Sequence, residues 1–226
     1  MSTAKEDILN RLRAAPKNRS QSQPAKPELL EASWSKAQQL EKLVEELTAQ
    51  ECTVFHFENK AQALDRLAEL CAEENLSSII ISDDDIIKAL DLQRWGETNG
   101  IKVMAAAQFK DRNSFKDAVF DEVDAGVTGV DFAVAESGSL ALVHDTSQAR
   151  LISLAPIIHI AMIPLKRIVP IYEDVIDTVF ADKKHLPSQL TFITGPSLTA
   201  DIQLTFFRGM HGPRRLIAIL IDEDIP

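Results

Sequence analysis

The sequence contains few cysteines. Its 226 residues include only Cys52 and Cys71, with no Cys-x-x-Cys motif and no cysteine–histidine cluster at the spacing of a zinc site. We therefore expect this chain alone to hold neither a structural metal nor an iron–sulfur cluster. Two such cysteines are typical of reduced thiols in a cytoplasmic protein.

The sequence also lacks a long apolar run and an excess of positive charge. Its most apolar stretch, residues 151–165, is interrupted by Pro156, His159 and Pro164 and is shorter than the roughly 20 residues that span a bilayer. Residues 1–15 mix charges of both signs and show no secretory signal. The net charge of −10 disfavours nucleic acid and anionic membrane surfaces as partners. These absences predict a cytoplasmic protein without a membrane span.

What the sequence does contain is an alternation of short apolar strands and amphipathic helices. Residues 3–15 predict a short helix and residues 16–33 a Pro-rich linker, so residues 1–33 are separated from a main domain at 34–226. The domain pattern predicts strands at 52–57, 79–81, 101–104, 157–163, 190–194 and 216–221, with helices near 40–47, 61–72, 114–120 and 171–183. The expected fold class is α/β, an open parallel or mixed sheet with helices on both faces.

The stretch from Gly126 to Asp145 predicts a hairpin with a carboxylate at its tip. Two apolar runs, 132–135 and 140–143, flank Glu136, Ser137, Gly138 and Ser139. Small neighbouring side chains leave room for a ligand, and a carboxylate there can act as an acid, a base or a nucleophile. Glu136 is therefore the candidate catalytic residue, with Ser137 and Gly138 beside it; the alternative is a solvated turn glutamate.

A second candidate stretch follows the strand expected at 190–194. It contains Gly195, Ser197, Thr199 and Asp201 at a point where a helix could begin. Ligands gather beyond the carboxyl ends of strands in open α/β sheets, and free N–H groups at a helix start bind anions. These four residues are candidate substrate-binding residues, and an ordinary turn with a helix N-cap is the alternative.

A third candidate stretch is the Gly-rich loop before the last strand. His211 lies between two glycines, Gly209 and Gly212, and can titrate and reach a ligand. Arg214 can clamp a carboxylate. His211, Gly212 and Arg214 are therefore candidate substrate-binding residues, against the alternative of a plain surface loop.

Two other polar features are expected to be structural. Asp83, Asp84 and Asp85 precede a helix, where carboxylates stabilise the N-terminus, and we favour this over a metal site. His159 lies among isoleucines, which predicts a buried histidine with satisfied hydrogen bonds rather than a ligand-binding one.

Several motifs together resemble the LUD-domain family. They are GVTGVDFAVAESGSLALV at 126–143, ITGPSLTADI at 193–202 and GMHGPRR at 209–215, and the resemblance extends over about residues 40–221. Within the family the chain is most similar to small lactate-utilisation subunits that carry no iron–sulfur cluster. The resemblance implies a fold like that of the sugar-phosphate isomerase and CoA-transferase superfamily (NagB/RpiA/CoA-transferase-like).

The resemblance also implies a function. The leading hypothesis is a component of a system that oxidises L-lactate to pyruvate with two iron–sulfur partner proteins, which would hold the clusters, while this chain binds a small carboxylate. A second hypothesis is a CoA- or acyl-transferase, because CoA-transferases of the similar fold use a glutamate near a glycine as nucleophile, as Glu136 could. A third is a non-catalytic ligand-binding or assembly subunit that docks through residues 1–33.

Overall fold

The computed structural model describes residues 4–15, 33–144, 149–182, 184, 186–200 and 206–224. The chain divides into two units, Met1–Glu31 and Ala32–Pro226. In the first unit, the expected short helix is confirmed as α1 (Ala4–Ala14), with acidic residues in its first turn and basic residues in its last. Its apolar side chains Ile8, Leu9 and Leu12 are all exposed.

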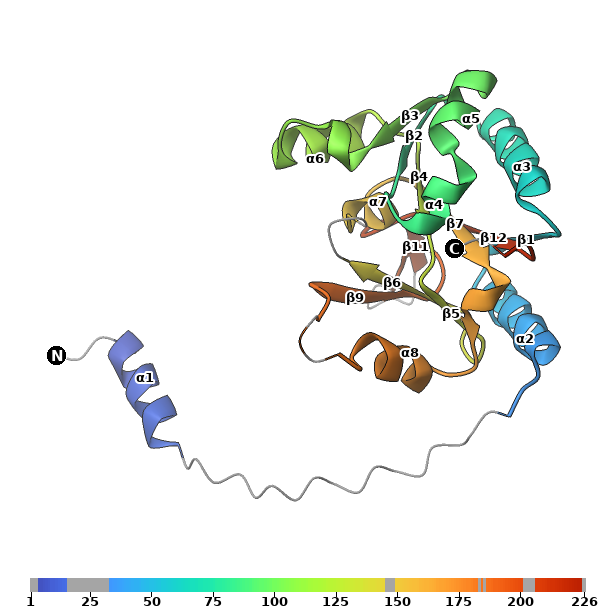
Figure 1. Ribbon diagram of the computed structural model, residues 1–226. Helices are drawn as coiled ribbons and strands as arrows, with labels where there is room; N and C mark the ends of the chain where they lie inside the picture. The colour runs from blue at the N-terminus through green and yellow to red at the C-terminus, as the bar shows by residue number, and fades with distance from the viewer. Residues whose placement is uncertain are drawn as a thin grey trace. The chain divides into compact units, whose positions relative to one another are not determined.

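A six-stranded parallel sheet forms the centre of the second unit (Figure 1). Its strands lie in the order β1–β12–β7–β4–β2–β3. Their bounds in chain order are β1 (Thr53–Phe57), β2 (Ser78–Ile81), β3 (Lys102–Ala105), β4 (Ala125–Gly129), β7 (Ile158–Pro164) and β12 (Arg215–Ile221). β2, β4 and β7 are buried along their whole length, because a parallel sheet is covered on both faces.

Three helices cover one face of this main sheet. They are α3 (Lys60–Glu73), α4 (Asp85–Leu90) and α5 (Leu92–Asn99), whose apolar side chains pack on Ile79, Ile160 and Ile219. The expected capping role of the aspartates is confirmed for Asp84, whose Oδ1 accepts a 3.0 Å hydrogen bond from the N–H of Ile87 at the start of α4.

The opposite face is covered in two parts. Over β2 and β3 lie α6 (Arg112–Asp121) and α7 (Leu151–Leu154), where Val119 and Ile152 pack on Ile80 and Met104. Over β7 and β12 lie α2 (Lys36–Ala49) and a second sheet, which share a core with Ala161, Leu216 and Ala218. Figure 1 shows α3 and α5 on one side of the main sheet and α6 and α7 on the other.

The second sheet has four strands and mixed directions. Its order is β8–β5–β6–β9, with β5 parallel to β8 and β6 antiparallel to both β5 and β9. The strands are β5 (Phe132–Val134), β6 (Ser139–His144), β8 (Ile168–Val169) and β9 (Gln189–Ile193), and α8 (Tyr172–Val179) packs on the face turned away from the main sheet. The remaining elements are the β10–β11 hairpin (Leu198–Ala200, Phe206–Arg208) and the short turns η1 (Ala106–Gln108) and η2 (Leu165–Arg167).

The α/β class, the helices on both faces and the hairpin formed by β5 and β6 are confirmed. The expected open parallel or mixed sheet is confirmed in part: the main sheet is parallel throughout, and the antiparallel pairs that the expectation placed in the same sheet belong to a separate small sheet. The helix expected after Ser197 is instead strand β10, and the helix expected to reach residue 183 ends at Val179. In the part of the chain that the structure describes, no helix is both long and apolar enough to cross a membrane.

Candidate functional site

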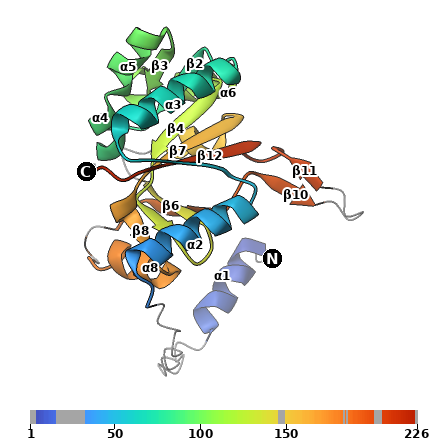
Figure 2. The ribbon, with the colours of Figure 1, turned by 90° about the vertical axis from the view of Figure 1, so that its right-hand side faces the viewer.

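The second and third candidate stretches lie side by side at the amino ends of β7 and β12. The Ser197 N–H donates to the Pro213 carbonyl at 2.8 Å, and the Gly209 N–H donates to the Ser197 carbonyl at 3.0 Å. The Arg214 N–H donates to the carbonyl of Ile157, just before β7, at 2.8 Å. The strand that precedes Ser197 is β9 of the small sheet, so this site is not at the carboxyl edge of the main sheet. Figure 2 shows the β10–β11 hairpin at the end of β12 opposite the C-terminus.

Ser197 is the residue that connects these two stretches. Its Oγ accepts a long hydrogen bond of 3.4 Å from the His211 N–H. A Cβ at Gly212 would lie 3.3 Å from the Ser197 Cβ, so Gly212 allows the close approach. His211 and Arg214 are both exposed, which leaves their side chains accessible at this edge.

Two further candidates of the second stretch lie on either side of Ser197. Gly195 precedes the turn and has φ +90°. Thr199 lies in β10, opposite Phe207 of β11. Asp201 lies outside the described residues, and its candidate role stays a prediction.

Glu136 is exposed and contacts the start of α8. Its Oε1 accepts a 2.9 Å hydrogen bond from the Tyr172 N–H, the first N–H of that helix, and its own N–H donates to the Pro170 carbonyl at 3.1 Å. The residue in the N-cap position, Ile171, has no polar side chain to do this. The carboxylate therefore occupies a position where it satisfies a helix N–H and stabilises the helix dipole.

A hydroxyl cluster, formed by Ser137, Ser139, Tyr172 and Thr194, adjoins Glu136. The fully buried Ser139 Oγ accepts from the Ser137 Oγ at 3.0 Å, lies 2.5 Å from the Thr194 Oγ1 and contacts the Tyr172 hydroxyl. The Tyr172 ring also packs edge to face on Phe192, with centroids 4.8 Å apart. The cluster joins the β5–β6 turn, the end of β9 and α8.

Sequence reasoning missed Ser139, Tyr172 and Thr194 as members of a polar cluster. The available signal is strand alternation, because Ser139 and Ala141 share the face of β6 that packs under α8. A buried hydroxyl on that face requires a polar partner, and Tyr172 is the single tyrosine of the chain.

The last turn of α2 forms a wall beside these residues. Gly138 has φ +63°, and a Cβ there would lie 2.7 Å from the backbone N of Leu47. A Cβ at Gly195 would lie 2.9 Å from the Gln50 carbonyl oxygen. Both turns therefore pack backbone against backbone with the end of α2, which only glycine permits without strain.

A cavity of about 220 Å³ lies between the end of α2 and the Thr194–Leu198 segment. Its lining includes Ser197 and Thr194, whose hydroxyls suit a small polar ligand, and also the Glu51 carboxylate. Of the candidate residues that the structure describes, Ser197 is the one that lines this cavity, and Glu136, His211 and Arg214 do not line it. The full lining is Ala49, Gln50, Glu51, Thr194, Pro196, Ser197 and Leu198.

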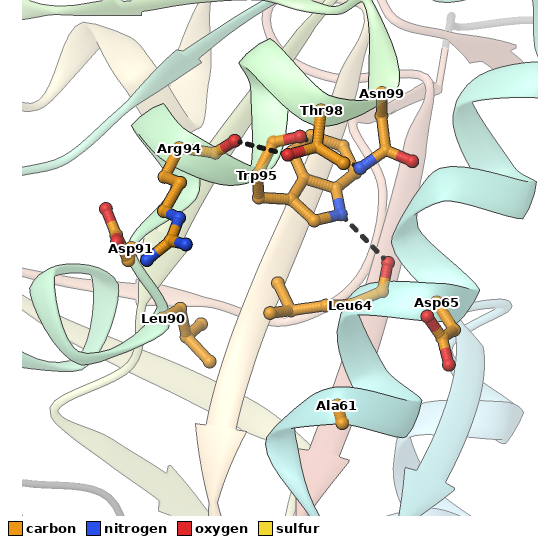
Figure 3. A pocket seen from close by; sticks show the side chains of 9 residues that line it. All are labelled: Ala61, Leu64, Asp65, Leu90, Asp91, Arg94, Trp95, Thr98 and Asn99. Atoms are coloured by element: carbon orange, nitrogen blue, oxygen red, sulfur yellow. Dashed lines mark hydrogen bonds between the residues drawn. The ribbon is translucent and has the colours of Figure 1, made fainter.

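A second cavity, of about 430 Å³, lies between α3 and α5 and contains none of the candidate residues (Figure 3). The indole ring of Trp95 forms part of its wall, and the Trp95 Nε1–H donates to the Leu64 carbonyl at 3.1 Å. The Thr98 hydroxyl donates to the Arg94 carbonyl at 3.1 Å. These donors are therefore satisfied within the wall itself. Figure 3 shows the apolar side chain of Leu90 together with the charged side chain of Asp91 in the lining.

His159 is fully buried, as expected for a core histidine. Its Nε2 lies 2.9 Å from the Thr128 Oγ1, and burial lowers its pKa to about 3. No group of the described residues hydrogen-bonds its Nδ1. The expected hydrogen bonding of the buried ring is therefore observed at Nε2 only.

Comparison with known proteins identifies the family. The family model called LUD domain matches residues 40–221. "Lactate utilization protein C" of Anoxybacillus flavithermus is 30% identical over 178 residues, which cover 77% of this chain and 78% of that protein. "Lactate utilization protein C 1" of Bacillus mycoides is 31% identical over 180 residues, 76% of each.

A crystal structure of a DUF162 family protein from Deinococcus radiodurans is similar in fold. It superposes with a TM-score of 0.60 at 21% identity and covers 83% of this chain and 99% of that protein. The motifs that resembled the LUD-domain family all lie within the matched range. The sequence-based assignment is thus confirmed, and this chain belongs to the LUD-domain family.

Proposed function

We propose that this chain is a subunit of a cytoplasmic system that oxidises L-lactate to pyruvate together with two iron–sulfur partner proteins. The observation that carries the proposal is the LUD-domain match over residues 40–221, together with relatives named for lactate utilisation. Oxidation of lactate releases two electrons and two protons. Cys52, just before β1, and Cys71, in α3, are both buried, so in this proposal the electrons pass to clusters in the partners.

The proposed position for the small carboxylate is the edge formed by Ser197 and the 209–214 loop. Arg214 and His211 are exposed there, and the Ser197 hydroxyl accepts the backbone N–H of His211. An arginine fork and a neighbouring hydroxyl are donors that match a 2-hydroxy acid. The carboxylate of the ligand would be bound by Arg214, with its hydroxyl or carbonyl oxygen near His211.

A CoA- or acyl-transferase that uses Glu136 is less well supported. A nucleophilic carboxylate must be free to attack, whereas Glu136 already accepts the N–H of Tyr172 at the start of α8. The third hypothesis, a non-catalytic assembly subunit, is distinguished from lactate binding by the Arg214→Ala variant in the experiment below.

The test is reconstitution. The two iron–sulfur proteins are purified from the same source and assayed for lactate-dependent dye reduction with and without this chain. Activity that requires the chain supports the proposal, and equal activity without it contradicts the proposal.

Arg214→Ala should raise the KM for lactate, whereas Arg94→Ala, an exposed arginine of α5, should leave it unchanged. If Arg214→Ala has no effect while the chain is still required, the assembly role is favoured.

A further inference from the structure

A third cavity, of about 390 Å³, lies between the start of α6 and the start of α7. Its volume falls within the range of small-molecule sites. It contains none of the residues used in the proposed function, so a ligand bound in it would be independent of that function. The lining consists of Ala106, Phe109, Asp111, Arg112, Phe115, Ala149, Arg150 and Leu151.

One wall of this cavity is aromatic. The rings of Phe109 and Phe115 pack edge to face, with centroids 5.6 Å apart and planes at 71°. Both rings are half-buried against the core beneath α6 and α7. Both residues line the cavity, and a third aromatic ring can pack on such rings in an offset or edge-to-face arrangement.

The rim of the cavity carries two arginines. Arg112 is the first residue of α6, where a positive charge is unfavourable for the helix dipole, so helix formation does not explain its presence. Arg150 comes just before α7, and its Nη1 contacts the Gln189 Oε1 at the start of β9. Two exposed guanidinium groups therefore flank one aromatic hollow in a chain whose net charge is −10.

Asp111 limits how much negative charge the cavity can accept. Its carboxylate accepts the N–H groups of Ser114 at 2.9 Å and of Asn113 at 3.0 Å, which hold its pKa below the usual range. It is therefore ionised at neutral pH. Two arginines and one aspartate leave one net positive charge in the lining, which matches a monoanion better than a phosphate dianion.

We propose that this cavity binds an aryl carboxylate, a monoanion with a single aromatic ring. The guanidinium groups of Arg112 and Arg150 donate to the carboxylate, a pairing that arginine makes with two parallel hydrogen bonds. The ring of the ligand packs on Phe109 and Phe115. A carboxylate without a ring lacks the aromatic contact, and a neutral ring lacks the charge pairing.

The test is calorimetric titration of the full chain with phenylpyruvate as the probe. Arg112→Ala and Arg150→Ala should each weaken binding about tenfold or more, because each removes a charge-assisted hydrogen bond. Phe115→Leu, which keeps an apolar side chain but removes the ring, should weaken binding several-fold. Arg94→Ala, an exposed arginine on the rim of the α3–α5 cavity, is the matched control and should bind as the wild type does.

Pyruvate and phenyl phosphate complete the experiment. Pyruvate has the carboxylate without the ring, and phenyl phosphate has the ring with a second negative charge, so both should bind more weakly than phenylpyruvate. The proposal is overturned by an absence of saturable binding at millimolar phenylpyruvate, or by binding that the double variant R112A/R150A retains. Preference for phenyl phosphate would overturn the assignment of a carboxylate.

Discussion

The carboxylate of Glu136 accepts the backbone N–H of Tyr172 at 2.9 Å, and the side chain of the same tyrosine returns to Ser139 in the same turn. The β5–β6 turn and α8 are therefore joined twice, once by a helix cap and once by a side-chain hydroxyl. Because Ile171 cannot cap α8, the cap comes from a residue 36 positions away in the chain. A carboxylate that sequence alone marks as a catalytic candidate thus has a structural partner.

Glu136→Ala should lower the free energy of unfolding by about 1 kcal/mol, because α8 loses the acceptor of an N-terminal N–H group. Glu136→Gln should retain most of the stability, since its amide oxygen can accept the same hydrogen bond. Urea unfolding followed by circular dichroism measures both variants.

The same two variants distinguish a catalytic role of Glu136 from a structural one when they are tested in the lactate-dependent dye-reduction assay. If Glu136→Gln is stable but inactive, the carboxylate itself takes part in the reaction. If Glu136→Gln is fully active, the role of Glu136 is to hold α8, and its assignment as a catalytic residue is wrong.

Ser139→Ala should destabilise the protein by about 1–3 kcal/mol, because it leaves the Tyr172 and Thr194 hydroxyls without their buried partner. Ser137→Ala is the matched control: it removes a half-buried hydroxyl that makes one bond to the cluster, and its effect should be smaller. Equal urea midpoints for the two variants would contradict a central role for Ser139.

Gly138→Ala should cost more stability than Gly100→Ala. Both glycines have positive φ, +63° and +71°, so both substitutions carry a backbone penalty of about 1 kcal/mol. Only at Gly138 would the new Cβ meet the backbone of α2, at 2.7 Å from the Leu47 nitrogen, whereas nothing lies within 4 Å at Gly100. The difference between the losses of unfolding free energy in the two variants therefore gives the cost of placing a Cβ where the turn contacts α2.

The central parallel strands were predictable where they are apolar, and β4 was not. β2, β7 and β12 are mostly apolar strands rich in isoleucine, which the pattern identifies directly. β4 contains Gly126 and Gly129, and glycine argues against a strand. The structure explains both glycines: a Cβ at Gly126 would overlap the Ile152 carbonyl oxygen, and one at Gly129 would overlap the Asp84 carboxylate.

The loops of the candidate site could be predicted from the sequence, but their arrangement relative to one another could not. The proximity of Ser197 to the 209–214 loop depends on hydrogen bonds between segments whose pairing no local pattern encodes. The edge at which they meet depends on which strands share a sheet, and strand pairing is a long-range property. The Tyr172 contact with Ser139 was missed for the same reason, since 33 residues separate the two.

The buried His159 should make the stability of the protein depend on pH. Burial lowers its pKa from an ordinary 6.5 to about 3, so between these values the unfolded chain binds a proton that the folded protein does not. Stability contributed by this residue is therefore present above pH 6.5 and is lost as the pH falls, by up to about 1.4 kcal/mol per pH unit. The urea midpoint of the wild type should fall accordingly between pH 7 and pH 5.

His159→Gln removes the titrating ring while keeping a side chain that can hydrogen-bond Thr128, so its unfolding free energy should depend less steeply on pH across the same window. Thr128→Val is the matched control, because it removes the partner 2.9 Å from the His159 Nε2 and leaves the histidine in place. Thr128→Val should lose about 1 kcal/mol at every pH and keep the wild-type slope. If His159→Gln and the wild type show the same slope, the imidazole takes up a proton without unfolding, and its burial does not control the acid stability of this protein.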